Sequence, residues 1–98
     1  MKIHHYFVYI LKCIDNTYYT GVTNNITRRY SEHEQGIDPK SYTFSRRPLK
    51  LVWFEEFSNI EFAIEKEKQI KKWSKAKKEA LINDNYKALP SLSKKKLE

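Results

Sequence analysis

The chain has 98 residues, of which 40% are hydrophobic and 14% aromatic, and its 19 lysines and arginines outnumber 12 acidic residues to give a net charge of +7. This length is enough for one domain with a modest core, and the aromatic content argues against an intrinsically disordered chain. The positive charge indicates a polyanionic partner such as nucleic acid, although many small basic domains bind nothing charged.

The first third of the sequence predicts a β-hairpin followed by a short helix. Residues 6–13, YFVYILKC, and 18–23, YYTGVT, are rich in aromatic and β-branched side chains and flank the polar turn IDNT. Residues 24–36, NNITRRYSEHEQG, predict a helix that has Thr23 or Asn24 as its N-cap and ends at Gly36.

The rest of the sequence predicts a third strand and two further helices. A loop at 37–48 leads to LKLVWFEEF at 49–57, which has the composition of a strand. A helix then starts after Ser58 or Asn59 and runs to about Trp73, and SKAKKEALIND at 74–84 forms another, capped by Ser74. The order β-β-α-β-α-α predicts an α+β fold with a three-stranded antiparallel sheet flanked by helices.

The chain termini and the single cysteine, Cys13, bear on domain limits and location. One cysteine cannot form an internal disulfide, which is typical of a reducing compartment, and the apolar run at residues 1–11 is too short to cross a membrane. We therefore expect a cytoplasmic protein. We expect one domain over residues 1–90 and a flexible basic tail at 91–98, where the last two residues could be a cloning remnant.

One face of the 58–73 helix is apolar except for a single acid. On a wheel at about 100° per residue, Glu67 falls in the middle of the face made by Ile60, Ala63, Ile64 and Ile70. A carboxylate pointing at the sheet must be neutralised, paired with a cation or bound to a metal, because burying it unpaired costs several kcal/mol. A nearby arginine or lysine is the simpler interpretation, and a metal ion is the sharper one.

The helix at 24–36 carries two basic side chains on one face. Arg29 and His33 are four residues apart and share that face, whereas Arg28 is turned by about 100° towards solvent. A single histidine in such a position is more often structural than catalytic.

The strand tyrosines divide between the two faces of the predicted sheet. Tyr9 shares its face with Phe7 and Leu11, and the adjacent Tyr18 and Tyr19 must point to opposite faces, so at most one of them can join Tyr9. Bulky aromatic residues on strands usually belong to the core.

Together these segments resemble the GIY-YIG nuclease superfamily. VYI at 8–10 and YTG at 19–21 look like the two halves of its signature, with Val8 and Thr20 replacing the first glycine and the middle isoleucine. Arg29 follows ten residues after Tyr19, at the spacing of the family's catalytic arginine, and a histidine follows four residues later. AIEKEKQIKKW at 63–73 resembles the stretch that carries the family's metal-ligating glutamate. The resemblance covers about residues 6–90 and is strongest with small stand-alone bacterial members.

The resemblance implies a divalent-metal-dependent endonuclease that hydrolyses phosphodiester bonds, with DNA rather than RNA as the expected substrate. Glu67 would hold one Mg²⁺ or Mn²⁺, and Arg29 would clamp phosphate oxygens. Tyr9 would orient or deprotonate the attacking water, with His33 as the other candidate base, and Tyr19 would position the phosphate or the water. Tyr9 and Tyr19 would meet across the hairpin, with Tyr18 turned into the fold.

Other parts of the chain would then contact the substrate or complete the site. Between residues 66 and 78 there are seven lysines and one acid, which predicts a basic ridge. The expected nucleic-acid contacts are Arg28, Lys66, Lys71, Lys72, Lys75 and Lys78. A further asparagine of the family could correspond to Asn83 or Asn85, and the 37–48 loop or a protein partner would select the substrate. The alternative is a non-catalytic nucleic-acid-binding module that retains the nuclease fold.

Overall fold

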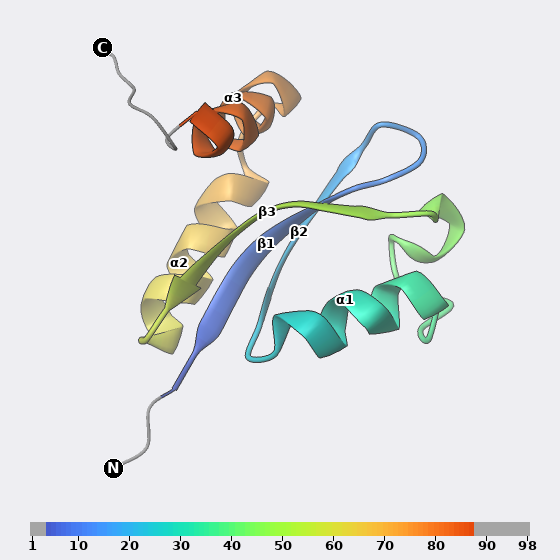
Figure 1. Ribbon diagram of the computed structural model, residues 1–98, viewed down its shortest axis with the longest axis horizontal. Helices are drawn as coiled ribbons and strands as arrows, with labels where there is room; N and C mark the ends of the chain where they lie inside the picture. The colour runs from blue at the N-terminus through green and yellow to red at the C-terminus, as the bar shows by residue number, and fades with distance from the viewer. Residues whose placement is uncertain (1–3, 88–98) are drawn as a thin grey trace.

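The hairpin predicted near the N-terminus is formed by β1 (Tyr6–Lys12) and β2 (Tyr18–Thr23) in a computed structural model that describes residues 4–87, the last three by their backbone alone. β3 (Lys50–Phe57) pairs with the other side of β1, and both pairings are antiparallel. The strand order β2-β1-β3 places β1 in the centre and leaves β2 at an edge (Figure 1). The predicted sheet is confirmed, and the predicted tail at 91–98 lies outside the described residues.

The helices also follow the predicted order. They are α1 (Ile26–Gln35), α2 (Ile60–Lys71) and α3 (Lys75–Lys87), and a short 3₁₀ helix, η1 (Phe44–Arg46), lies in the loop before β3. Asn59 caps α2, and the Ser74 hydroxyl accepts the backbone N–H of Lys77 at the start of α3. Within the described residues, no helix is both long enough and apolar enough to cross a membrane.

The N-cap of α1 is Asn25, so the prediction of Thr23 or Asn24 was wrong by one or two residues. The Asn25 side chain accepts the backbone N–H of Arg28 at 3.0 Å. Thr23 still ends β2, and its hydroxyl accepts the N–H of Asn25 at 3.1 Å, which extends the turn before the helix. At the other end α1 stops at Gly36 as predicted, where φ is 68° and a glycine avoids the strain of a side chain.

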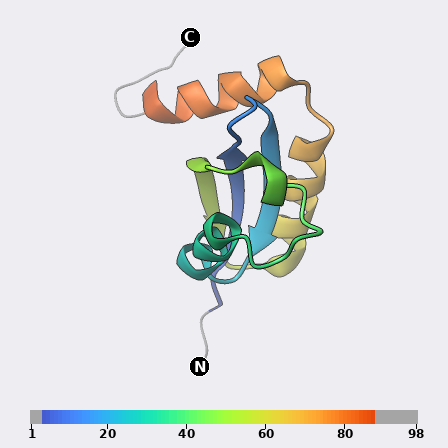
Figure 2. The ribbon, with the colours of Figure 1, turned by 90° about the vertical axis from the view of Figure 1, so that its right-hand side faces the viewer.

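The helices cover the two faces of the sheet, α1 on one side and α2 with α3 on the other (Figures 1 and 2). Tyr9 and Leu11 face α1, and Tyr19 packs beside them. The opposite face carries Val8, Ile10 and Tyr18, together with the buried residues of the longer helices. The predicted alternation of β1, and the opposite directions of the two neighbouring tyrosines of β2, are therefore confirmed.

The buried stripe of α2 is narrower than the wheel suggested. Ala63, Glu67 and Ile70 are buried, whereas Ile60 and Ile64 are 39% and 37% exposed. A sheet of three strands offers a narrow surface to the helix, so only the line of residues at its centre is covered, and the flanking isoleucines remain at the rim.

Candidate active site

Tyr9 and Tyr19 meet on the α1 face of the hairpin, but as diagonal neighbours. Tyr9 lies opposite Gly21 and Tyr19 lies opposite Leu11, and the centroids of the two phenol rings are 6.2 Å apart. The glycine makes this possible, because a Cβ at position 21 would lie 2.5 Å from the phenol oxygen of Tyr9. The glycine of the YTG segment therefore provides the space that the Tyr9 ring occupies.

Helix α1 places His33 against both tyrosines. His33 is 4% exposed, its Nε2 lies 3.0 Å from the phenol oxygen of Tyr9, and its ring meets the Tyr19 ring edge-on at 5.1 Å between centroids. The four-residue spacing that places His33 and Arg29 on one helix face thus brings both side chains to the tyrosines.

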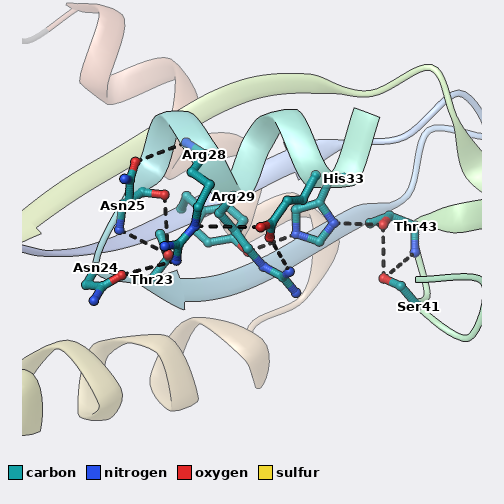
Figure 3. Close-up of polar contacts among 10 residues, drawn as sticks. Thr23, Asn24, Asn25, Arg28, Arg29, His33, Ser41 and Thr43 are labelled. Atoms are coloured by element: carbon teal, nitrogen blue, oxygen red, sulfur yellow. Dashed lines mark hydrogen bonds and ion pairs between the residues drawn. The ribbon is translucent and has the colours of Figure 1, made fainter. Parts of the chain in front are cut away.

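Arg28 and Arg29 differ in direction, as the helical spacing predicted (Figure 3). The Arg29 side chain is 37% exposed, donates from Nη1 to a carboxylate oxygen of Glu32 at 3.0 Å, and lies close enough to Tyr9 to affect its ionisation. The Arg28 side chain is 57% exposed and lies at 3.6 Å from the same glutamate. Only Arg29 is therefore available both to the tyrosines and to a ligand from solvent.

The second ring nitrogen of His33 contacts the loop that follows α1. Nδ1 lies 2.9 Å from the hydroxyl oxygen of Thr43, which in turn lies 3.0 Å from the hydroxyl oxygen of Ser41 (Figure 3). Sequence reasoning missed both residues. No periodic pattern marks them, because their position depends on the path of an irregular loop rather than on a helix or strand.

Burial governs the ionisation of the central pair. Burial, and then the nearby Tyr19, raise the pKa of Tyr9 to about 12, while the guanidinium of Arg29 acts in the opposite direction. Burial, and then the positive charge of Arg29, lower the pKa of His33 below its usual 6.5. At neutral pH the pair therefore consists of a protonated phenol and a neutral imidazole.

Glu67 points from α2 towards the other face of the sheet and is 8% exposed. The wheel prediction of a buried carboxylate is confirmed. Its partner is a lysine one turn later, because Lys71 Nζ lies 2.6 Å from the Glu67 carboxylate, and that hydrogen bond raises the pKa of Lys71. The simpler of the two interpretations, a neighbouring cation, therefore describes this structure.

The two faces of the sheet meet at the edge formed by β2. Lys71 and Tyr19 line one hollow of about 200 Å³ there, so Glu67 is connected to the tyrosines through its lysine partner. Four of the candidate residues gather on the α1 face of the sheet: Tyr9, Tyr19, Arg29 and His33. Glu67 lies on α2, on the opposite face.

The donor set around Glu67 limits the kind of metal site that it could form. Among the side chains that the structure describes, no three histidine, cysteine, aspartate or glutamate residues are grouped as metal ligands would be. Mg²⁺ is often held by one or two carboxylates, several waters and a substrate phosphate. The single Glu67 carboxylate fits that kind of site, provided that Lys71 moves aside.

Comparison with known proteins identifies the family. The GIY-YIG catalytic domain matches residues 5–80 of this chain. The chain belongs to the GIY-YIG family. A UPF0213 protein from Syntrophus aciditrophicus (strain SB) is 48% identical over 79 residues, which are 81% of this chain and 91% of that protein.

Two proteins with solution NMR structures share this fold. The UPF0213 protein from Bacillus halodurans has a TM-score of 0.54 and 38% identity, covering 81% of this chain and 83% of that one. A protein from E. faecalis has a TM-score of 0.60 and 28% identity, covering 96% of this chain and 95% of that one.

The GIY-YIG signature of this chain therefore corresponds to β1 and β2. Its two departures, Val8 and Thr20, both point to the α2 face and are buried. The Thr20 hydroxyl has no hydrogen-bond partner among the described residues. The departures thus lie on the side of the sheet away from the four clustered residues.

The expected nucleic-acid contacts of this GIY-YIG domain occupy more than one surface. Lys71 and Lys78 line the hollow beside Tyr19, whereas Lys66 and Lys72 line a separate groove of about 740 Å³ on α2. Lys75 and Arg28 are exposed. The predicted basic ridge is therefore divided, and only part of it adjoins the clustered residues.

The two candidates for the family's further asparagine both lie on α3. Asn83 is exposed on α3, and the side chain of Asn85 lies outside the described residues.

Proposed function

We propose that this protein is an endonuclease that hydrolyses phosphodiester bonds in nucleic acid, with DNA as the expected substrate and one divalent ion held by Glu67. The observation that carries the proposal is the hydrogen bond between the Tyr9 phenol and Nε2 of the buried, neutral His33. This pair lies beside the half-exposed Arg29 in a GIY-YIG domain. This arrangement offers a proton acceptor and a phosphate-binding cation at one place.

Arg29 would bind the scissile phosphate. Its planar guanidinium can donate two parallel hydrogen bonds to phosphate oxygens, which a lysine cannot reproduce. The ion pair with Glu32 orients the side chain while leaving it accessible. Charge that develops on the phosphate in the transition state would thus meet a fixed cation.

Tyr9 and His33 would act together on the attacking water. A phenol with a pKa of about 12 is protonated at neutral pH and is a poor base by itself. Its hydrogen-bond partner, a neutral imidazole, can accept a proton. Tyr9 would take a proton from the water as it passes its own proton to His33, so the two candidate bases form one unit.

Glu67 would hold the divalent ion at the β2 edge. When bound, such an ion neutralises charge at the scissile phosphate and the leaving oxygen. Lys71 would have to release the carboxylate, and its position beside Tyr19 would then bring its positive charge towards the substrate.

The alternative is a nucleic-acid-binding module without catalysis. The ion pair between Glu67 and Lys71 favours it, because the predicted metal ligand already has a cation as partner. The intact cluster on the α1 face favours the nuclease, since a binding module has no need for a buried tyrosine–histidine pair.

Nicking of supercoiled plasmid in Mg²⁺ or Mn²⁺ tests the proposal, with chelated metal and Glu67→Ala as the inactive comparisons. Tyr9→Phe should lose activity while retaining binding of the plasmid. The wild type could bind plasmid yet cleave neither plasmid nor branched or single-stranded oligonucleotides. That result would favour the non-catalytic module.

A further inference from the structure

The hydroxyl of Thr43 is buried against the side of His33 that faces away from the tyrosines. Thr43 is 1% exposed, and its oxygen lies 2.9 Å from His33 Nδ1. A neutral imidazole carries one proton, on either Nδ1 or Nε2, and the partners of the two nitrogens decide which. The proton position therefore depends on the directions of the hydrogen bonds on both sides of the ring.

Arg29 restricts the hydrogen-bond directions on the tyrosine side of the ring. A guanidinium has donors and no acceptor, so the Tyr9 oxygen beside it turns its lone pairs towards Arg29. The phenol hydrogen can then point at His33 Nε2, 3.0 Å away, or at Tyr19, with which Tyr9 also shares a side-chain hydrogen bond. When the phenol donates to Nε2, the imidazole proton must reside on Nδ1, so the partner of Nδ1 decides between the two arrangements.

The loop side can receive that proton. Thr43 Oγ1 can accept from Nδ1–H while its own hydrogen points to the Ser41 oxygen at 3.0 Å. Ser41 and Thr43 both line a small cavity of about 40 Å³ at the end of α1, large enough for a water molecule. Every donor in the series Tyr9, His33, Thr43 then has an acceptor.

We propose that Thr43 is a positioning residue that holds neutral His33 in the Nδ1–H tautomer and so keeps Nε2 available to the Tyr9 phenol. Its catalytic consequence rests on the proposed nuclease function, whereas the tautomer itself does not. During attack, an O–H bond of water would break as its proton moves to Tyr9, and the phenol proton would move to Nε2. The resulting imidazolium would keep its Nδ1–H bonded to Thr43.

The first test reads the tautomer of His33 by ¹⁵N NMR of the imidazole nitrogens, with no substrate present. The chain has three histidines, so the His33 signals are assigned from their loss in His33→Gln. The wild type and Thr43→Ser should carry the proton on Nδ1. Thr43→Val, which keeps the shape but removes the acceptor, should shift the proton to Nε2. A wild-type proton on Nε2, or no change in Thr43→Val, would overturn the proposal.

The second test compares cleavage rates. Thr43→Val should lower the rate by about 10- to 100-fold, part of the 10²- to 10⁴-fold that general acid–base catalysis contributes. Thr43→Ser should restore most of it, and Thr27→Val, at an exposed position of α1, should leave the rate unchanged. Equal thermal stability of Thr43→Val and Thr27→Val would show that the loss is not unfolding.

The two tests separate the inference from the proposed function. An Nδ1–H tautomer that depends on Thr43, in a protein that cleaves no nucleic acid, would support the positioning role and refute the nuclease. Cleavage that is unaffected by Thr43→Val would refute the catalytic role of Thr43 and leave the nuclease standing.

Discussion

Gly21 lies directly across the hairpin from Tyr9, and the Tyr9 ring fills the space that a side chain at Gly21 would need. A Cβ there would lie 2.5 Å from the phenol oxygen, and Tyr9 is only 1% exposed, so its ring cannot turn out into solvent. The second signature segment thereby fixes the place of the oxygen that bonds to His33.

Gly21→Ala is expected to displace Tyr9 and to destabilise the protein by about 1 to 3 kcal/mol, as overpacking does. Urea unfolding measures the stability, and plasmid nicking measures the loss of activity. Gly36→Ala is the matched comparison. Gly36 has a φ of 68°, so a side chain there also destabilises the protein, but this residue lies away from Tyr9. The Gly36→Ala protein that remains folded should still cleave the plasmid. A fully active Gly21→Ala protein would refute the role given to this contact.

Arg29→Lys should lower the cleavage rate by about a hundredfold or more despite keeping the charge, the usual effect of losing a hydrogen-bond donor to the transition state. Arg28→Lys should be nearly silent, because that side chain points to solvent. Rates of both variants are compared after circular dichroism shows that each is folded. Equal losses in the two variants would mean that the site is assigned to the wrong face of α1.

Lys71→Met should expose the competition between lysine and metal for Glu67. The Lys71 side chain is 54% exposed, so solvent screens the pair, and removing the cation should cost the metal-free protein only about 1 kcal/mol of stability. Mn²⁺ should then raise the Tm of this variant more than that of the wild type, since it no longer has to displace Lys71. Glu67→Gln should show no such increase. An equal rise in all three proteins would place the ion elsewhere.

The ionisation of His33 predicts an acid limit for both activity and stability. Its pKa in the folded protein lies below 6.5, and the charged form cannot accept the phenol proton, so the rate should fall as the pH falls through that lowered value. Because the unfolded chain binds this proton more readily, stability should also decline as the pH drops below 6.5.

NMR titration of His33 checks this directly. Arg29→Gln should raise the pKa of His33 by removing a positive charge, although burial, the larger cause, should still keep it below 6.5. Titration of His33 above 6.5 in the wild type would contradict the buried neutral state.

Salt dependence should distinguish the two lysine surfaces. Binding of the wild type to DNA should weaken steeply as salt rises, because lysine–phosphate contacts release counterions. Lys78→Gln, in the hollow beside Tyr19, should reduce the slope of log K against log salt by about 0.9. Lys66→Gln, in the separate groove on α2, should change it less. Binding that is insensitive to salt would refute the electrostatic interpretation.

Local periodicity is enough to predict most of the candidate site. A helix repeats every 3.6 residues, so the spacing of Arg29 and His33 fixes their common face, and the place of Glu67 among apolar residues fixes its burial. A strand repeats every two residues, which separates Tyr19 from Tyr18. The family signature adds the expectation that these segments converge, and the shared β2 edge is where they approach one another.

Contacts that depend on the packing of distant segments were decided only by the tertiary structure. The hairpin register makes Tyr9 and Tyr19 diagonal rather than opposite neighbours, and the narrow sheet leaves Ile60 and Ile64 at its rim. The contact between His33 and Thr43 depends on a loop without a repeating pattern. Helices and strands impose a period that sequence reveals, whereas an irregular loop takes its path from the surfaces it packs against, and those surfaces exist only in the folded chain.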